Sequence, residues 1–231
     1  GGRTGHCRPQ NGAFMNSRED ILARVRANLG VKAGDESRRE SARGTLAARR
    51  RGPRPSLGED LAARFAAKSA AMSSTVETVT DIGDVPAAVT RYLAGLGLPP
   101  RAVCWPQFSG LAWAEAGVAV EMRAAGGDDA VGVTGCFCAI AETGTLMLAS
   151  GPQTAATTSL LPETHIAVVP VSRIVPAMEE AFALLRAERG EDLPRAVNFV
   201  SGPSRTGDIE QTIVLGAHGP YRVHLLLVEG A

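Results

Sequence analysis

The chain has 231 residues, of which 45% are hydrophobic and 21% are charged, so it contains enough apolar material for a buried globular core. Its formal net charge is zero, which argues against a nucleic-acid binder or a protein held to an anionic membrane. No stretch approaches the roughly 20 apolar residues of a membrane span. We therefore expect neither a nucleic-acid partner nor a membrane span.

The chain begins with a segment, residues 1–14, that has no apolar core of a secretory signal. We expect Met15 to be the native start, residues 1–14 to be a disordered addition or a misassigned start, and the protein to be cytoplasmic. Residues 16–30 then predict a short amphipathic helix, because aliphatic residues recur at helical spacing before Gly30. These residues are Ile21, Leu22, Val25 and Leu29. We expect this apolar face to pack against the main body or against a partner subunit.

Residues 31–58 are rich in Arg, Pro, Gly and Ser, and we interpret them as a linker or mobile arm. The basic run at 38–54 has no interleaved aromatic residues, which favours a solvated segment over a nucleic-acid contact. A second helix is predicted over 59–72. The expected organisation is therefore an N-terminal helical arm over 15–58, followed by one α/β domain over 59–231.

Strands and helices alternate from about residue 75, which is typical of βαβ units and a parallel sheet. The predicted strands are 75–80, 101–105, 118–122, 165–171, 195–200 and 221–228, and the predicted helices are 84–95, 108–117, 154–161 and 176–189. The stretch 130–150 predicts two strands joined at "ETGT", with a tight turn at Thr143-Gly144. The predicted fold class is α/β, with a mostly parallel sheet flanked by helices.

Two polar loops follow predicted strands, one after Val200 and one over 142–145. Ligands of parallel α/β sheets bind beyond the carboxyl ends of the strands, so both loops are candidate sites. Gly202 and Gly207 have the spacing of the phosphate-binding loop of nucleotide-binding proteins. Asp208, however, stands where that loop needs a lysine. The carboxylate repels phosphates, which excludes nucleoside triphosphates.

Another anion site is consistent with the loop after Val200. Arg205 offers a bidentate fork for a carboxylate or phosphate, and Gly202, Ser204 and Thr206 provide a flexible, hydroxyl-bearing backbone at a predicted helix start. The structural alternative is equally consistent. In it, Asp208 caps the helix with Gln211 reaching back, and Arg205 pairs with Glu210 or Glu142.

Glu142 lies between apolar strands, so it is a candidate general base or nucleophile, or else a hairpin-end carboxylate held by backbone amides. His218 lies in a loop near the proposed ligand end and is the one histidine that we select as a catalytic candidate. No histidine has metal-ligand spacing, and no CxxC pair occurs. We therefore expect no metal in this chain, and we interpret Cys136 and Cys138 as small buried residues of one strand face.

The sequence resembles the LUD domain of the lactate utilization protein C (LutC/YkgG) family. The resemblance rests on "GCFCAIAETGTLMLASGP", "LLPETHIAVVP" and above all "SGPSRTGDIEQTIVLGAHGPYRVHLLLV". It covers Met15 to the C-terminus and is densest from residue 131. The matching motif positions are Glu142, Thr143, Gly144, Thr145, Gly202, Pro203, Ser204, Arg205, Thr206, Asp208, Ile209, Glu210, His218 and Gly219. Gly207 departs from the alanine that is common in the family.

The resemblance implies a NagB/RpiA/CoA-transferase-like fold. It also implies a bacterial cytoplasmic protein that acts with two iron–sulfur partner proteins in the oxidation of L-lactate to pyruvate. The clusters belong to the partners, so no cofactor is expected in this chain. The resemblance assigns no catalytic residue.

Three hypotheses follow. The first is a non-redox subunit of a lactate-oxidising system, which binds a small carboxylate or a partner's acidic loop through Arg205. The second is a stand-alone enzyme of the CoA-transferase or sugar-phosphate isomerase type that uses Glu142. The third is a binding or regulatory module, which binds a small anion or contacts a partner or nucleic acid through the basic arm at 38–54.

Overall fold

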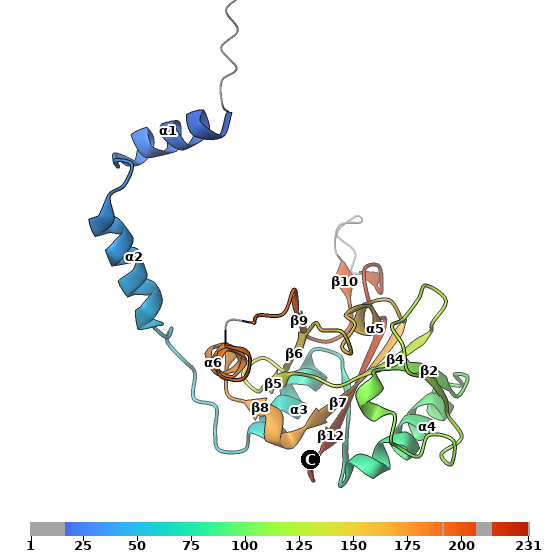
Figure 1. Ribbon diagram of the computed structural model, residues 1–231. Helices are drawn as coiled ribbons and strands as arrows, with labels where there is room; N and C mark the ends of the chain where they lie inside the picture. The colour runs from blue at the N-terminus through green and yellow to red at the C-terminus, as the bar shows by residue number, and fades with distance from the viewer. Residues whose placement is uncertain (1–16, 191, 207–213, 231) are drawn as a thin grey trace, which may run out of the picture. The chain divides into compact units, whose positions relative to one another are not determined.

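The computed structural model describes residues 17–190, 192–206 and 214–230 (Figure 1). The chain divides into two units, an arm within residues 1–53 and a body within 54–231. The sequence placed this boundary at residue 58. That boundary stays a prediction. In the second unit, the Arg54 guanidinium pairs with Glu180 at 2.8 Å and with Glu179 at 3.2 Å.

The arm contains two helices, α1 (Ser17–Leu29) and α2 (Glu36–Ala48). The predicted helix over 16–30 is thus confirmed for its described residues, and its four aliphatic side chains are exposed. Helix α2 was not predicted. It has no buried residue and is stabilised locally, because the Asp35 side chain caps it and Glu36 pairs with Arg39 at 3.0 Å.

The body is built on a six-stranded sheet in the order β1-β12-β7-β4-β2-β3, and every adjacent pair is parallel. Its strands are β1 (Thr75–Val79), β2 (Arg101–Cys104), β3 (Ala119–Glu121), β4 (Val131–Thr134), β7 (Thr164–Pro170) and β12 (Arg222–Val228). The prediction of a mostly parallel α/β sheet is confirmed. The interior strands β7 and β12 are mostly apolar and buried, because helices and loops cover both faces of a parallel sheet.

A second sheet has the order β8-β5-β6-β9. Its strands are β5 (Cys138–Ile140), β6 (Thr145–Ala149), β8 (Ile174–Val175) and β9 (Val197–Val200). Strands β5 and β6 form the predicted antiparallel hairpin, with Gly144 at a φ of 69° in its turn. Strand β9 pairs antiparallel with β6, so it does not extend the parallel sheet. A two-stranded ribbon of β10 (Arg205–Thr206) and β11 (Val214–Leu215) completes the strands.

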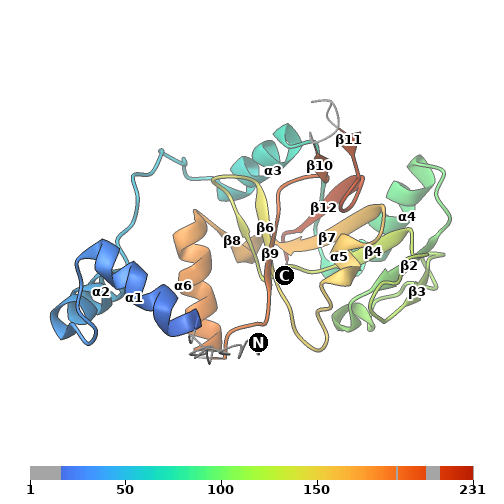
Figure 2. The same ribbon diagram turned by 90° about the horizontal axis from the view of Figure 1, so that it is seen from above.

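The helices of the body flank the two sheets. They are α3 (Leu61–Ala71), α4 (Val85–Gly95), α5 (Thr157–Leu160) and α6 (Met178–Arg189). Short 3-10 turns lie at Ile82–Asp84, Pro106–Phe108 and Val171–Arg173. Helix α3 contacts both β1 and β8, and thus lies between the sheets, with Phe65 fully buried. Figure 2 shows α6 beside β8 of the second sheet, while α4 and α5 lie on the side of the main sheet.

The prediction of a helix over 108–117 is wrong, because this segment consists of turns. The Trp113 ring N–H donates to the Phe108 carbonyl at 2.8 Å, and Gly117 has a φ of 78°. Burial of the indole in this way stabilises a compact turn instead of a helix. The helix predicted over 154–161 is also shorter, since only α5 is helical. No helix in the described part of the chain is long and apolar enough to cross a membrane.

Candidate functional site

The two polar loops singled out in the sequence meet at the carboxyl end of helix α3. We call this region the α3 junction; it comprises residues 68–73, 142–145 and 201–206. A Cβ atom on Gly144 would lie 2.5 Å from the Ser69 backbone nitrogen, and one on Gly202 would lie 2.1 Å from the Met72 carbonyl oxygen. Both glycines also have a positive φ, 69° and 77°. Only glycine allows both loops to approach the helix so closely.

A chain of hydroxyl groups connects the two loops at the α3 junction. The Thr145 hydroxyl lies 2.7 Å from the Thr143 hydroxyl and 2.7 Å from the Ser201 hydroxyl. The Ser69 hydroxyl donates to the Gly144 carbonyl at 3.2 Å. Thr143, Gly144 and Thr145 therefore hold the hairpin in register with the loop after β9.

Replacing Thr145 by valine should lower the free energy of unfolding by about 1 kcal/mol, because the shape is kept while both hydroxyl contacts are lost. Urea denaturation would measure the loss. Thr143→Val is the matched control, since Thr143 is exposed and makes only one of the two contacts. An equal loss in both variants would contradict a central role for Thr145.

Arg205 is exposed and contacts the end of helix α3. Its Nη2 donates to the Met72 carbonyl at 3.3 Å and to the Ser73 hydroxyl. Ser73 itself has a φ of 69°, which is unusual for a residue other than glycine. A cation at the carboxyl end of a helix is favourable for the helix dipole. Arg205 therefore helps to end α3, and its contacts among the described residues do not include Glu142.

The remaining loop residues divide between the described and the undescribed parts of the chain. Asp208 and Glu210 lie outside the described residues, as does the helix start predicted there. Ser204 donates its backbone N–H to the Pro220 carbonyl at 2.9 Å and accepts one from Gly216 at 3.0 Å. Arg205 and Thr206 form β10, paired with β11, so the loop after Val200 continues into a ribbon.

Glu142 lies beside the segment that leads into helix α6. Its backbone N–H donates to the Pro176 carbonyl at 3.0 Å, and the residue is half-buried. The hydrogen bond that the Arg54 guanidinium donates to Glu180 is the main cause that raises the pKa of Arg54, and the charges of Glu180, Glu179 and Glu142 add to it. The structure thus brings Glu142 near Arg54. A catalytic role for Glu142 stays a prediction.

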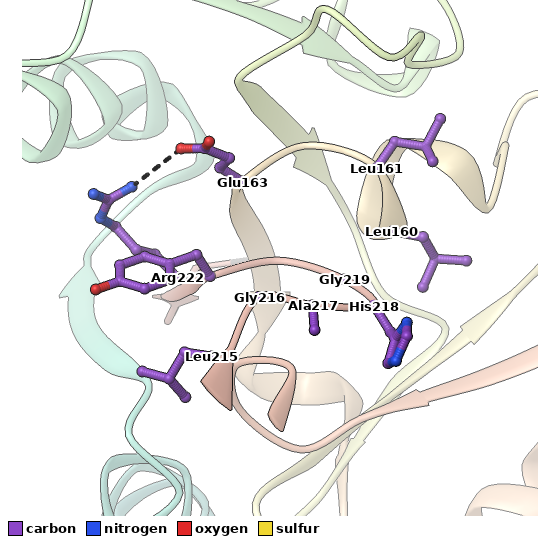
Figure 3. Close-up of a pocket in the computed structure, with 10 residues that line it drawn as sticks. Leu160, Leu161, Glu163, Leu215, Gly216, Ala217, His218, Gly219 and Arg222 are labelled. Atoms are coloured by element: carbon purple, nitrogen blue, oxygen red, sulfur yellow. Dashed lines mark ion pairs between the residues drawn. The ribbon is translucent and has the colours of Figure 1, made fainter. Parts of the chain in front are cut away.

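A pocket of about 780 Å³ opens beside the α5–β7 loop and the amino end of β12 (Figure 3). We call it the β7–β12 pocket. Its lining residues are Leu160, Leu161, Glu163, Leu215, Gly216, Ala217, His218, Gly219, Tyr221 and Arg222. His218 and Leu160 lie on one side of it, away from Glu163 and Arg222 (Figure 3). The pocket thus combines one arginine and an exposed imidazole with several aliphatic side chains.

Arg222 is the one cation among these lining residues. Its guanidinium lies over the Tyr221 ring, 4.9 Å from the centroid, and Nη1 reaches the Thr164 hydroxyl at 3.4 Å. Nη1 is also 4.0 Å from the Glu163 carboxylate, which is a long ion pair. Arg222 is not among the site residues predicted from the sequence. A charged residue at the start of a mostly apolar strand was the available signal.

The pocket lies at the amino ends of the strands, whereas ligand sites were expected at their carboxyl ends. Arg222 pairs with Thr164, and both begin their strands, so the pocket is at the amino ends of β7 and β12. The loop after Val200 does follow the carboxyl end of a strand. That strand, β9, belongs to the second sheet and runs antiparallel to β6, so the rule for parallel sheets does not apply to it.

Three cysteines lie in the described part of the chain, and burial raises the pKa of each. Burial raises the pKa of Cys136 to about 12 and that of Cys138 to about 11, so both thiols are protonated at neutral pH. Cys104 is also buried and its pKa is raised to about 12, mainly by desolvation. No group of three or more His, Cys, Asp or Glu side chains in the described ranges is arranged to hold a metal ion.

The fold is that of an α/β protein in which two polar loops, 142–145 and 201–206, pack against the carboxyl end of helix α3. The LUD domain family matches residues 63–228, which is well over half of the chain. The chain belongs to the LUD domain family. A crystal structure of a DUF162 family protein from Deinococcus radiodurans is similar in fold, with a TM-score of 0.55 and 24% identity, over 76% of this chain and 99% of that chain.

Two proteins named lactate utilization protein C are more similar to this chain in sequence than the Deinococcus radiodurans protein is. Lactate utilization protein C 1 of Bacillus mycoides is 44% identical over 101 residues, which is 43% of each chain. Lactate utilization protein C of Bacillus licheniformis is 39% identical over 135 residues, which is 54% of this chain and 53% of that protein. The chain spans about half the length of the relatives that it matches.

Proposed function

We propose that this protein is a subunit, without a redox cofactor of its own, of a cytoplasmic iron–sulfur system that oxidises L-lactate to pyruvate. The observation that carries the proposal is the 39–44% identity to proteins named lactate utilization protein C. The motif loops through which the sequence resembles that family come together at the α3 junction, which supports a shared role for them.

In this proposal the iron–sulfur clusters belong to partner subunits. The sequence supports that assignment, because it contains no CxxC pair of the kind that holds such clusters. The contribution of this chain is then to bind a small carboxylate or an acidic loop of a partner. Arg205 is the predicted contact, since its guanidinium is exposed and lies at the end of α3, which both motif loops approach.

Deleting the gene from its own organism should abolish growth on L-lactate and leave growth on pyruvate unchanged. Lactate-dependent reduction of an artificial electron acceptor in cell extracts would be measured beside growth. The wild-type gene should restore both. Unchanged lactate oxidation in the deletion strain would contradict the proposed function.

An Arg205→Gln variant in the same strain tests the predicted contact. It should fail to restore growth on lactate although the protein accumulates, because glutamine keeps a hydrogen-bond donor near Met72 but removes the charge. Arg91→Gln is the control, since Arg91 is also exposed but pairs with Glu77 of β1. Full growth with Arg205→Gln would exclude Arg205 as the anion contact while leaving the subunit role open.

A further inference from the structure

We propose that the β7–β12 pocket binds an organic monocarboxylate with an apolar body of several carbons, whose carboxylate is held by Arg222. This ligand is larger than lactate, so the inference goes beyond the proposed function. It rests on the volume of the pocket, on the contacts of Arg222 and on the exposure of the surrounding apolar side chains.

The size of the pocket favours a ligand of this class. Pockets that bind small molecules usually measure about 300–1,000 Å³ and combine an apolar lining with a few polar groups that orient the ligand. The β7–β12 pocket, at about 780 Å³, falls within this range. Lactate has a single methyl group and would leave most of this volume to water.

The guanidinium of Arg222 is oriented but weakly paired. Tyr221 stacks on one of its faces, and its backbone is fixed because its N–H donates to the Glu163 carbonyl at 2.9 Å. Among the described residues its side-chain contacts are the 3.4 Å hydrogen bond to Thr164 and the 4.0 Å approach to Glu163. A carboxylate that binds the guanidinium side-on would make two shorter, charge-assisted hydrogen bonds.

The Glu163 carboxylate competes for the same position. Its side chain is 76% exposed, and it lies at the limit of ion-pair distance, so an incoming carboxylate can displace it into solvent. Glu163 therefore lowers the affinity for anions without closing the pocket. Removing its charge should strengthen binding, which makes the residue useful as a test.

Apolar side chains supply the second part of the recognition. Leu160, Leu161, Leu215 and Tyr221 are all at least 39% exposed, although large apolar side chains are usually buried. They share one pocket with Arg222, so a ligand that joins a carboxylate to a branched aliphatic group would cover them. Neither a phosphate ion nor acetate would do so.

The test uses the purified chain and titrates it by NMR with 4-methylpentanoate, acetate and 4-methylpentanamide. We expect 4-methylpentanoate to bind about 10-fold or more tightly than either of the others. Acetate lacks the branched aliphatic group, and 4-methylpentanamide lacks the charged carboxylate. Equal binding of all three compounds, or no detectable binding of 4-methylpentanoate, would overturn the proposal.

Variants locate the binding. Arg222→Gln should weaken 4-methylpentanoate binding about 10-fold or more, whereas Glu163→Gln should strengthen it a few-fold. Arg91→Gln, outside the pocket, should leave it unchanged. Thermal melts confirm that each variant is folded, and an unchanged affinity in folded Arg222→Gln would contradict the assignment. Growth on lactate tests the proposed function separately, so each can fail alone.

Discussion

Replacing Gly202 by alanine should lower the free energy of unfolding by about 3 kcal/mol or more. Two costs add. Gly202 has a φ of 77°, where a Cβ costs about 1–2 kcal/mol. That Cβ would also lie 2.1 Å from the Met72 carbonyl oxygen, so backbone must move, and overpacking of this kind costs about 1–3 kcal/mol.

Gly97→Ala separates the two costs. Gly97 has a φ of 66°, but nothing lies within 4 Å of the position that its Cβ would occupy. It should therefore lose only about 1–2 kcal/mol. Urea denaturation of both variants gives the difference. If Gly202→Ala lost no more than Gly97→Ala, the close contact between the loop and helix α3 would be refuted.

This contact also explains why "SGP" and "ETGT" belong to one structural unit. Gly144 and Gly202 press on residues 68–72 from two loops, and Thr145 connects the loops through Ser201. A ligand-binding role at Arg205 would then depend on the position of the end of α3. The Gly202→Ala variant should accordingly impair growth on lactate at temperatures below the one at which the purified variant unfolds.

Much of the fold was predictable because local patterns decide it. The run of apolar residues in β7 and β12 can be accommodated only in strands that are covered on both faces. The β5–β6 hairpin was predictable from Gly144, whose positive φ the turn requires. Helix α6 followed from its acidic first turn and basic last turn.

The positions of the candidate sites were less predictable, because they depend on pairing between distant segments. Val197–Val200 has an ordinary strand pattern, and nothing in it indicates that β9 joins β6 instead of the parallel sheet. Arg222 becomes a pocket residue only through its register with Thr164, 58 residues earlier. The turn over 108–117 depends likewise on burial of Trp113, whereas the sequence predicted a helix there.

Two buried histidines should make the protein strongly sensitive to acid. His165 is fully buried, its Nε2 lies 2.8 Å from the Thr134 hydroxyl, and its Nδ1 has no partner among the described residues. His224 stacks on Tyr92 with centroids 3.8 Å apart and contacts the Thr75 hydroxyl at 2.8 Å. Burial lowers the pKa of each to about 4, which for His224 outweighs the opposing effect of Glu77.

The direction of the pH dependence follows from these pKa values. Between pH 6.5 and 4 the unfolded chain binds protons at both histidines that the folded chain does not, so stability falls as the pH falls. The pKa of each histidine drops from 6.5 to about 4, which at about 1.4 kcal/mol per unit corresponds to about 3 kcal/mol each. Asp129 and Glu188 have lowered pKa values, so their contributions are lost only at lower pH.

Urea midpoints measured at intervals between pH 7 and pH 4 should therefore decrease steeply below pH 6.5. His165→Gln and His224→Gln should each be less stable than the wild type at pH 7, because a buried hydrogen bond and packing are lost. Each should nevertheless show a smaller decrease toward pH 4, by about half, since one titrating group is gone. A wild-type midpoint that stayed constant over this range would show that neither imidazole is held neutral. A double variant with the full wild-type decrease would assign the acid sensitivity to other groups.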